Sequence, residues 1–222
     1  MSARDAVFSK IRRALGVGGS EAGRRAIVIA RLEGAPAGVV PKRGQLPREE
    51  RLALFQSMAE KVAATVARVP DTDAVPQAVA EYLRDRNLPA AVRMGADARL
   101  AALAWGKTQI EVGHGASDGN DPVAVSHALA GIAETGTLVL TSGADNPTTL
   151  NFLPETHIVV LAADDVAGDM ETVWAELRAR YGKGVMPRTV NMITGPSRSG
   201  DIEQTILLGA HGPRRLHIII AG

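Results

Sequence analysis

Cysteine is absent from the 222 residues of this chain. The chain by itself therefore cannot form a disulfide, use a thiolate nucleophile, or hold a zinc ribbon or a cysteine-ligated iron–sulfur cluster. Aromatic residues are also scarce, at three Phe, two Trp and two Tyr, so few rings are available to stack on nucleobases. We expect any redox cluster to lie on a partner protein.

Neither sign of charge dominates the sequence, which has 25 basic and 24 acidic residues. A polyanionic partner would favour a clear excess of Lys and Arg, so we expect no nucleic-acid partner. Long apolar runs are missing as well, because none approaches the ~20 residues that a membrane helix requires. The first 16 residues carry charged side chains and no central apolar block, unlike a secretory signal. We therefore expect a cytoplasmic protein without a membrane span.

Several common site motifs are also missing. The sequence contains no Gly-x-Gly-x-x-Gly, no Gly-x-x-x-x-Gly-Lys-Ser/Thr and no Gly-x-Ser-x-Gly. The usual sequence signatures of a dinucleotide site, a P-loop and an α/β-hydrolase site are therefore missing. The five histidines lie at positions 114, 127, 157, 211 and 217, and none are spaced as a helical metal site requires. We infer no metal site.

The first 48 residues differ in character from the rest of the chain. Residues 3–15 predict an amphipathic helix with Val7, Ile11 and Leu15 on one face. Residues 16–48 are rich in Gly and Pro and have few periodic apolar positions, which indicates an extended arm. We expect an N-terminal helix and extended arm over residues 1–48, which is either mobile or ordered by homo-oligomerisation, followed by one α/β domain over residues 49–222.

Apolar periodicity beyond residue 48 predicts alternating helices and strands. We expect helices around 52–66, 74–88, 98–105, 148–153 and 170–181. We expect strands at 90–94, 109–112, 123–126, 158–161, 189–193 and 215–220, with two more strands in 131–140 around Gly136. This alternation indicates an α/β fold with an open, mostly parallel sheet, helices on both faces and one antiparallel hairpin near Gly136.

The segment 194–203, Thr-Gly-Pro-Ser-Arg-Ser-Gly-Asp-Ile-Glu, follows a predicted strand and precedes what we expect to be a helix with Ile202, Ile206 and Leu207 on one face. Ligands of α/β proteins often bind at such junctions. Gly195 permits a tight turn, and Ser197, Arg198 and Ser199 supply donors that would hold an anion beside the first helical amides. The alternative is a purely structural helix cap made by Ser199 or Asp201.

Glu134 is the carboxylate that we single out, because it lies between two apolar runs and is followed by Thr135, Gly136 and Thr137. Burying a carboxylate costs free energy unless it has partners. Glu134 is therefore a candidate general base, or a group that binds or attacks a substrate, and the next three residues are candidate ligand contacts. The alternative is a structural glutamate bonded to neighbouring amides and hydroxyls.

Two further loops contain candidate ligand contacts. Ser142 begins a polar loop after the next strand, and His211 lies between glycines just before the last strand. For His211 the alternative is a surface histidine without a role. Glu155 and His157 follow the short helix at 148–153, and we favour a structural role for His157 at the start of its strand.

Four motifs together closely resemble the LUD-domain family, of the lactate-utilisation protein C type. They are Ile-Ala-Glu-Thr-Gly-Thr-Leu-Val-Leu at 132–140, Leu-Pro-Glu-Thr-His at 153–157, the segment 194–203, and Gly-Ala-His-Gly-Pro-Arg-Arg-Leu-His at 209–217. The resemblance is specific over 123–220 and looser over 49–122. It implies the fold shared by glucosamine-phosphate deaminase, ribose-phosphate isomerase and coenzyme A transferases.

The resemblance also implies a function. Such proteins are one of three components needed to oxidise L-lactate to pyruvate, and the other two carry iron–sulfur clusters. We therefore expect an accessory or substrate-binding component that binds a small anionic ligand, has no cofactor in this chain and works with iron–sulfur partner proteins. The alternative is a free-standing enzyme of the coenzyme A transferase or sugar-phosphate type, with Glu134 as nucleophile or base and an anion-binding turn at 197–199.

Overall fold

The structure is a computed structural model that describes residues 2–200 and 206–222. Its internal contacts divide the chain into two compact units, Met1–Val39 and Val40–Gly222. Among the residues described, every helix is too short or too polar to cross a membrane.

The first unit contains two amphipathic helices, α1 (Ala3–Leu15) and α2 (Ala22–Gly34), and buries no residue of either. Ser2 caps α1 by accepting a hydrogen bond from the Asp5 amide at 3.2 Å, and Gly16 ends the helix with φ +64°. Helix α1 agrees with the prediction for residues 3–15. Helix α2 lies where we expected an extended arm, because Gly occurs only near its two ends and its interior consists of helix-forming and aliphatic residues.

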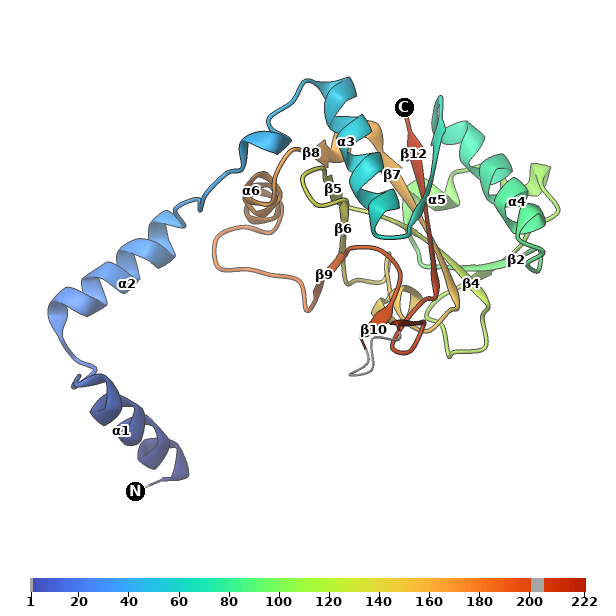
Figure 1. Cartoon of the computed structure of the whole chain (residues 1–222). Helices are drawn as coiled ribbons and strands as arrows, with labels where there is room; N and C mark the ends of the chain where they lie inside the picture. The colour runs from blue at the N-terminus through green and yellow to red at the C-terminus, as the bar shows by residue number, and fades with distance from the viewer. Residues whose placement is uncertain (1, 201–205) are drawn as a thin grey trace. The chain divides into compact units, whose positions relative to one another are not determined.

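The second unit is built around a six-stranded sheet in the order β1-β12-β7-β4-β2-β3, in which all described pairings are parallel. Figure 1 shows β12 and β7 running side by side at its centre. The strands are β1 (Thr65–Val69), β2 (Ala91–Met94), β3 (Glu111–His114), β4 (Val123–His127), β7 (Thr156–Ala162) and β12 (Arg215–Ala221).

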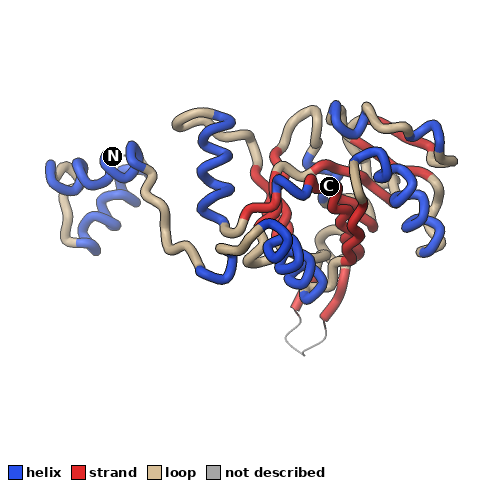
Figure 2. Tube along the Cα trace, turned by 90° about the horizontal axis from the view of Figure 1, so that it is seen from above, coloured by secondary structure: helices blue, strands red, loops and turns tan. Residues whose placement is uncertain are grey.

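Helices cover both faces of this main sheet, because alternate residues of a strand point to opposite faces. Val159 and Leu161 of β7 pack with α3 (Arg48–Lys61), whereas Ile158 and Val160 pack with α4 (Val75–Asp85) and α5 (Ala98–Ala101). The helices lie outside the strands of this unit in Figure 2. The predicted α/β fold, with a mostly parallel sheet and helices on both faces, is confirmed.

A second sheet has four strands in the order β8-β5-β6-β9. These are β5 (Ala130–Ile132), β6 (Thr137–Thr141), β8 (Val166–Ala167) and β9 (Val190–Ile193). Strands β5 and β6 form the antiparallel hairpin that we predicted near Gly136, and β9 pairs with β6. Helix α6 (Met170–Tyr181) packs on this sheet through Val173 and Leu177. Short 3-10 helices occupy Lys42–Gly44 (η1), Thr72–Ala74 (η2), Trp105–Lys107 (η3), Thr148–Asn151 (η4) and Ala163–Asp165 (η5).

Two predicted helical segments are strands in the structure. The helix that we extended to residue 66 ends at Lys61, and the chain reverses through Ala63, at φ +69°, into β1. The helix expected beyond Gly200 is wrong for the described residues 206–208, because β10 (Arg198–Gly200) pairs antiparallel with β11 (Ile206–Leu208). These backbone groups bond between strands and not along a helix. Asp201, which we named as a possible cap of that helix, lies outside the described residues.

Candidate functional site

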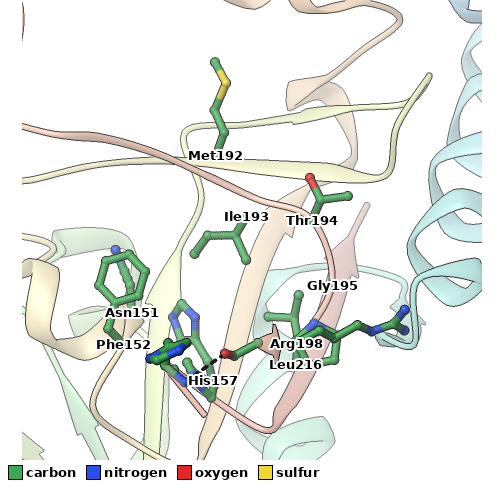
Figure 3. A pocket seen from close by; sticks show the side chains of 14 residues that line it. Asn151, Phe152, His157, Met192, Ile193, Thr194, Gly195, Arg198 and Leu216 are labelled. Carbon is green, nitrogen blue, oxygen red and sulfur yellow. Dashed lines mark hydrogen bonds between the residues drawn. The ribbon is translucent and has the colours of Figure 1, made fainter. Parts of the chain in front are cut away.

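A hollow of about 270 Å³ lies where three distant segments of the second unit converge. Its lining residues come from the end of η4 and the start of β7, from the chain that leaves β9, and from the loop that enters β12 (Figure 3). They are Asn151, Phe152, His157, Met192, Ile193, Thr194, Gly195, Pro196, Ser197, Arg198, His211, Gly212, Pro213 and Leu216. The volume suits a small ligand, since sites for drug-sized molecules occupy ~300–1,000 Å³.

The hollow occupies an unusual position in the fold. It adjoins the amino-terminal ends of β7 and β12, where His157 and Leu216 are the second residues of their strands. Ligands of open parallel sheets usually bind beyond the carboxyl ends of the strands. The carboxyl end that contributes here belongs to β9 of the second sheet, so the junction that we predicted after residue 193 does line the hollow.

Backbone hydrogen bonds hold the turn at 194–198 against the loop before β12. The Ser197 amide donates to the Pro213 carbonyl at 2.8 Å, and the Gly209 amide donates to the Ser197 carbonyl at 2.9 Å. The Ser197 hydroxyl accepts from the His211 amide at 3.3 Å. Gly195 has φ +75°, and a Cβ there would overlap the carbonyl oxygen of Val62. Only glycine fits at this position without a shift of the backbone.

Arg198, the cationic side chain of the lining, favours an anion in the hollow. Arg198 and His211 are both exposed, and no Asp or Glu occurs among the described residues that line the hollow. Ser197 and Thr194 add hydroxyl groups to the lining. A guanidinium without a competing carboxylate in the same cavity is well suited to bind a carboxylate or phosphate.

Two buried polar side chains, Asn151 and His157, also line the hollow, and they are 1% and 0% exposed. His157 Nε2 is 3.0 Å from the hydroxyl of Ser126 on β4. Burial lowers the pKa of His157 to about 3, so the ring is neutral near pH 7. His157 Nδ1 and both amide atoms of Asn151 are buried and find no hydrogen-bond partner within residues 2–200 and 206–222.

Four of the ligand contacts that we predicted come together in this hollow, namely Gly195, Ser197, Arg198 and His211. Ser199 does not line it, since it pairs with Leu207 in the β10–β11 hairpin. The sequence did not assign Asn151 to the site, and we favoured a structural role for His157. A histidine at the start of an otherwise apolar strand is the one signal that pointed to this pair.

Thr135 and Thr137 connect to the hollow through a row of hydroxyls. Thr135 Oγ1 and Thr137 Oγ1 are 2.7 Å apart, and Thr137 Oγ1 is 2.7 Å from Thr194 Oγ1. Thr194 lines the hollow, whereas the other two threonines do not. Their hydroxyls therefore reach the lining only through Thr194.

Gly136 and Ser142 make contacts that hold the fold together and do not line the hollow. Gly136 has φ +66°, and a Cβ there would strike the backbone of α3 at Met58 and Ala59, so glycine permits the close approach of the hairpin and the helix. The Ser142 hydroxyl accepts from the Thr189 amide at 2.9 Å and joins the end of β6 to the start of β9. Neither residue lines the hollow.

Glu134 also lies outside the lining of the hollow. Its carboxylate is 5% exposed and accepts a hydrogen bond from the Met170 amide at 3.1 Å, at the first residue of α6. Its other oxygen is 4.0 Å from Arg43 Nε. A carboxylate at a helix N-terminus stabilises the helix by satisfying a free amide and by opposing the helix dipole. The described surroundings of Glu134 are those of a helix cap.

Metal-binding side chains do not gather in the part of the chain that the structure describes. No group of three or more His, Asp or Glu side chains within that part could hold a metal ion.

Comparison with known proteins identifies the segment that contains the hollow. The family model of the LUD domain matches residues 119–221. The matched segment is therefore similar to a LUD domain. The match includes all lining residues of the hollow, together with Glu134. The resemblance that we saw in the four motifs is confirmed.

Several curated relatives match part of this chain. Lactate utilization protein C of Geobacillus sp. (strain WCH70) is 39% identical over 90 residues, which cover 40% of this chain and 37% of that protein. Lactate utilization protein C of Bacillus subtilis (strain 168) is 33% identical over 99 residues, which cover 44% of this chain and 41% of that protein. The chain thus matches about two fifths of the length of these relatives.

A solved structure shows a similar fold over a longer stretch. The crystal structure of a DUF162 family protein from Deinococcus radiodurans has a TM-score of 0.54 at 24% sequence identity. It covers 80% of this chain, and 99% of that protein is matched. The likeness therefore extends beyond the LUD match and supports the fold.

Proposed function

We propose that this chain takes part in lactate utilisation as an accessory or substrate-binding component, and that its LUD domain binds a small anionic ligand in the hollow. The role in lactate utilisation is supported by the relatives named lactate utilization protein C, which match about two fifths of this chain. Lactate and pyruvate are both small carboxylates, and a hollow of about 270 Å³ is large enough for either.

One observation carries the binding part of this proposal. Gly195, Ser197, Arg198 and His211 come from two loops that lie apart in sequence, and they line one hollow. The backbone bonds between Ser197 and the loop before β12 fix these groups relative to one another. A site that is already ordered loses less conformational entropy when its ligand binds.

Electron transfer would need a second protein in this proposal. Oxidation of lactate to pyruvate removes two electrons, and a chain without cysteine cannot hold a cysteine-ligated cluster to receive them. We therefore propose that the chain works with iron–sulfur partner proteins, which would carry the redox chemistry while the hollow holds the carboxylate.

The alternative is a free-standing enzyme of the coenzyme A transferase or sugar-phosphate type that uses Glu134. This function would require the Glu134 carboxylate to meet the substrate. In the described structure the carboxylate is buried, accepts a bond from the Met170 amide and does not line the hollow. These contacts give the alternative less support than the substrate-binding role.

Growth with L-lactate as the sole carbon source tests the proposal in a strain that lacks the chromosomal copy and any paralogue. We expect the wild-type chain to restore growth and Arg198→Ala to fail, because the carboxylate would lose its cationic partner. Arg214→Ala is the matched control, since Arg214 lines a neighbouring hollow and not this one. It should restore growth.

Full growth with Arg198→Ala at normal protein levels would contradict the role of the hollow. Growth of the deletion strain without any copy of the chain would contradict the role in lactate utilisation. Loss of growth with Glu134→Gln in a folded protein would favour the alternative enzyme.

A further inference from the structure

Polar groups divide the hollow into an exposed rim and a buried floor. Arg198 and His211 are exposed and form the rim. Asn151 and His157 form the floor, with 1% and 0% of their surfaces exposed. The rim carries charge that suits a carboxylate, whereas the floor offers hydrogen-bonding groups without net charge. The two levels therefore suit two different parts of one ligand.

The floor has unused hydrogen-bonding capacity. His157 Nδ1, Asn151 Nδ2 and Asn151 Oδ1 are buried, and the described residues provide no partner for any of them. A buried polar group without a partner destabilises the fold. Most buried polar groups in folded proteins are satisfied, so two side chains in one cavity that lack partners among the described residues are suited to receive a polar ligand.

His157 can either accept or donate at Nδ1. Its other nitrogen, Nε2, lies 3.0 Å from the Ser126 hydroxyl, which itself can donate or accept. If Nε2–H donates to Ser126, Nδ1 is free to accept from a ligand hydroxyl. If Ser126 donates to Nε2, Nδ1–H is free to donate to a ligand carbonyl. The neutral His157 ring can therefore form a hydrogen bond with either a hydroxyl or a carbonyl group of a ligand, depending on which partner donates between Nε2 and Ser126.

We propose that Asn151 and His157 bind the oxygen on C2 of a small 2-hydroxy or 2-oxo carboxylate whose carboxylate group is held at the rim by Arg198. The inference rests on the proposed function, because it assigns the ligand class of the same hollow. It adds a specificity determinant: the floor distinguishes acids that carry oxygen on C2 from acids that do not. It also explains why one site accepts both the reduced and the oxidised acid.

Isothermal titration with three acids of similar size tests this specificity. L-lactate carries a hydroxyl on C2, pyruvate carries a carbonyl, and propionate carries neither. We expect the wild-type chain to bind lactate and pyruvate about tenfold more tightly than propionate, because one net hydrogen bond of about 1.4 kcal/mol corresponds to tenfold in affinity. Equal binding of lactate and propionate would overturn the inference.

Variants of the floor and variants of the rim should change acid binding in different ways. Asn151→Leu and His157→Leu remove the floor contacts at similar volume, so we expect each to weaken lactate and pyruvate binding and to leave propionate binding unchanged. Ser126→Ala serves as a further variant in case either leucine variant fails to fold. It keeps the His157 ring and removes the hydroxyl next to Nε2, so it should reduce the ratio of lactate affinity to propionate affinity. Arg198→Ala should weaken all three acids alike.

The outcomes separate this inference from the proposed function. If all three acids bind equally and Arg198→Ala abolishes their binding, the rim site stands and the assignment of the floor is wrong. If none of the acids binds the wild-type chain, the anion site itself fails. If floor variants weaken propionate as much as lactate, their effect is structural, and the inference is overturned.

Discussion

Acidification from pH 6.5 to pH 4.5 should lower the free energy of unfolding by roughly 4 kcal/mol through two buried histidines alone. Burial lowers the pKa of His157 to about 3 and that of His217 to about 4, against ~6.5 in an unfolded chain. Between pH 6.5 and pH 4 the unfolded chain therefore binds more protons than the folded chain, and stability falls as the pH falls. Each histidine contributes about 1 kcal/mol per pH unit on average between pH 6.5 and pH 4.5.

Urea unfolding at pH 6.5, 5.5 and 4.5 measures this dependence. His217 stacks on Tyr82 with ring centroids 4.0 Å apart and bonds Thr65 Oγ1 through Nδ1 at 2.8 Å. His217→Phe keeps a ring against Tyr82 and cannot take up a proton, so it should remove about half of the pH dependence. His157→Leu should remove a similar share. A wild-type stability that stays level down to pH 4.5 would contradict the burial of both histidines.

Replacing Gly195 with alanine should cost about 2–4 kcal/mol of unfolding free energy and weaken ligand binding as well. The backbone of Gly195 has φ +75°, which is unfavourable for alanine, and the new Cβ would overlap the Val62 carbonyl oxygen. Relief of the overlap requires the turn at 194–198 to move away from the end of α3. Because Gly195 lines the hollow, that movement would also displace the neighbouring Ser197 and Arg198.

Gly184→Ala is the matched control for this substitution. Gly184 has φ +74°, almost the same as Gly195, but a Cβ there would meet no atom within 4 Å. It should lose only the ~1–2 kcal/mol that a left-handed conformation costs a residue other than glycine. Urea unfolding of both variants measures the difference. An equal loss in the two would show that Val62 does not restrict position 195.

The central strands could be predicted because their pattern is local. Ile158 to Leu161 of β7 and Ile218 to Ile220 of β12 are continuous apolar runs, as expected for strands that are covered on both faces. The end of α3 could not be placed, because Val62 and Val66 continue the helical spacing of its apolar residues while the chain turns at Ala63. Periodicity does not reveal a single left-handed residue that ends a helix.

The β10–β11 hairpin and the partners of the buried Glu134 and His157 side chains depend on contacts between residues that are distant in sequence. The pairing of Ser199 with Leu207 decides that this segment is not a helix, and no periodic pattern predicts it. Glu134 needed a partner, as its buried position suggested, but the partner is the Met170 amide 36 residues further along. His157 meets Ser126 from a neighbouring strand, 31 residues earlier. The sequence identified polar residues in apolar surroundings, and only the fold shows which groups they meet.

Thermal unfolding of the wild-type chain with added ligands tests most directly whether the hollow binds a small carboxylate. L-lactate, pyruvate, phosphate and coenzyme A would each be added in excess to wild type, Arg198→Ala and Arg214→Ala, since a ligand at 100 times its dissociation constant stabilises by ~2.7 kcal/mol. We predict that lactate and pyruvate stabilise wild type and Arg214→Ala but not Arg198→Ala. Stabilisation by coenzyme A alone, or a lactate effect that Arg198→Ala retains in full, would contradict the account.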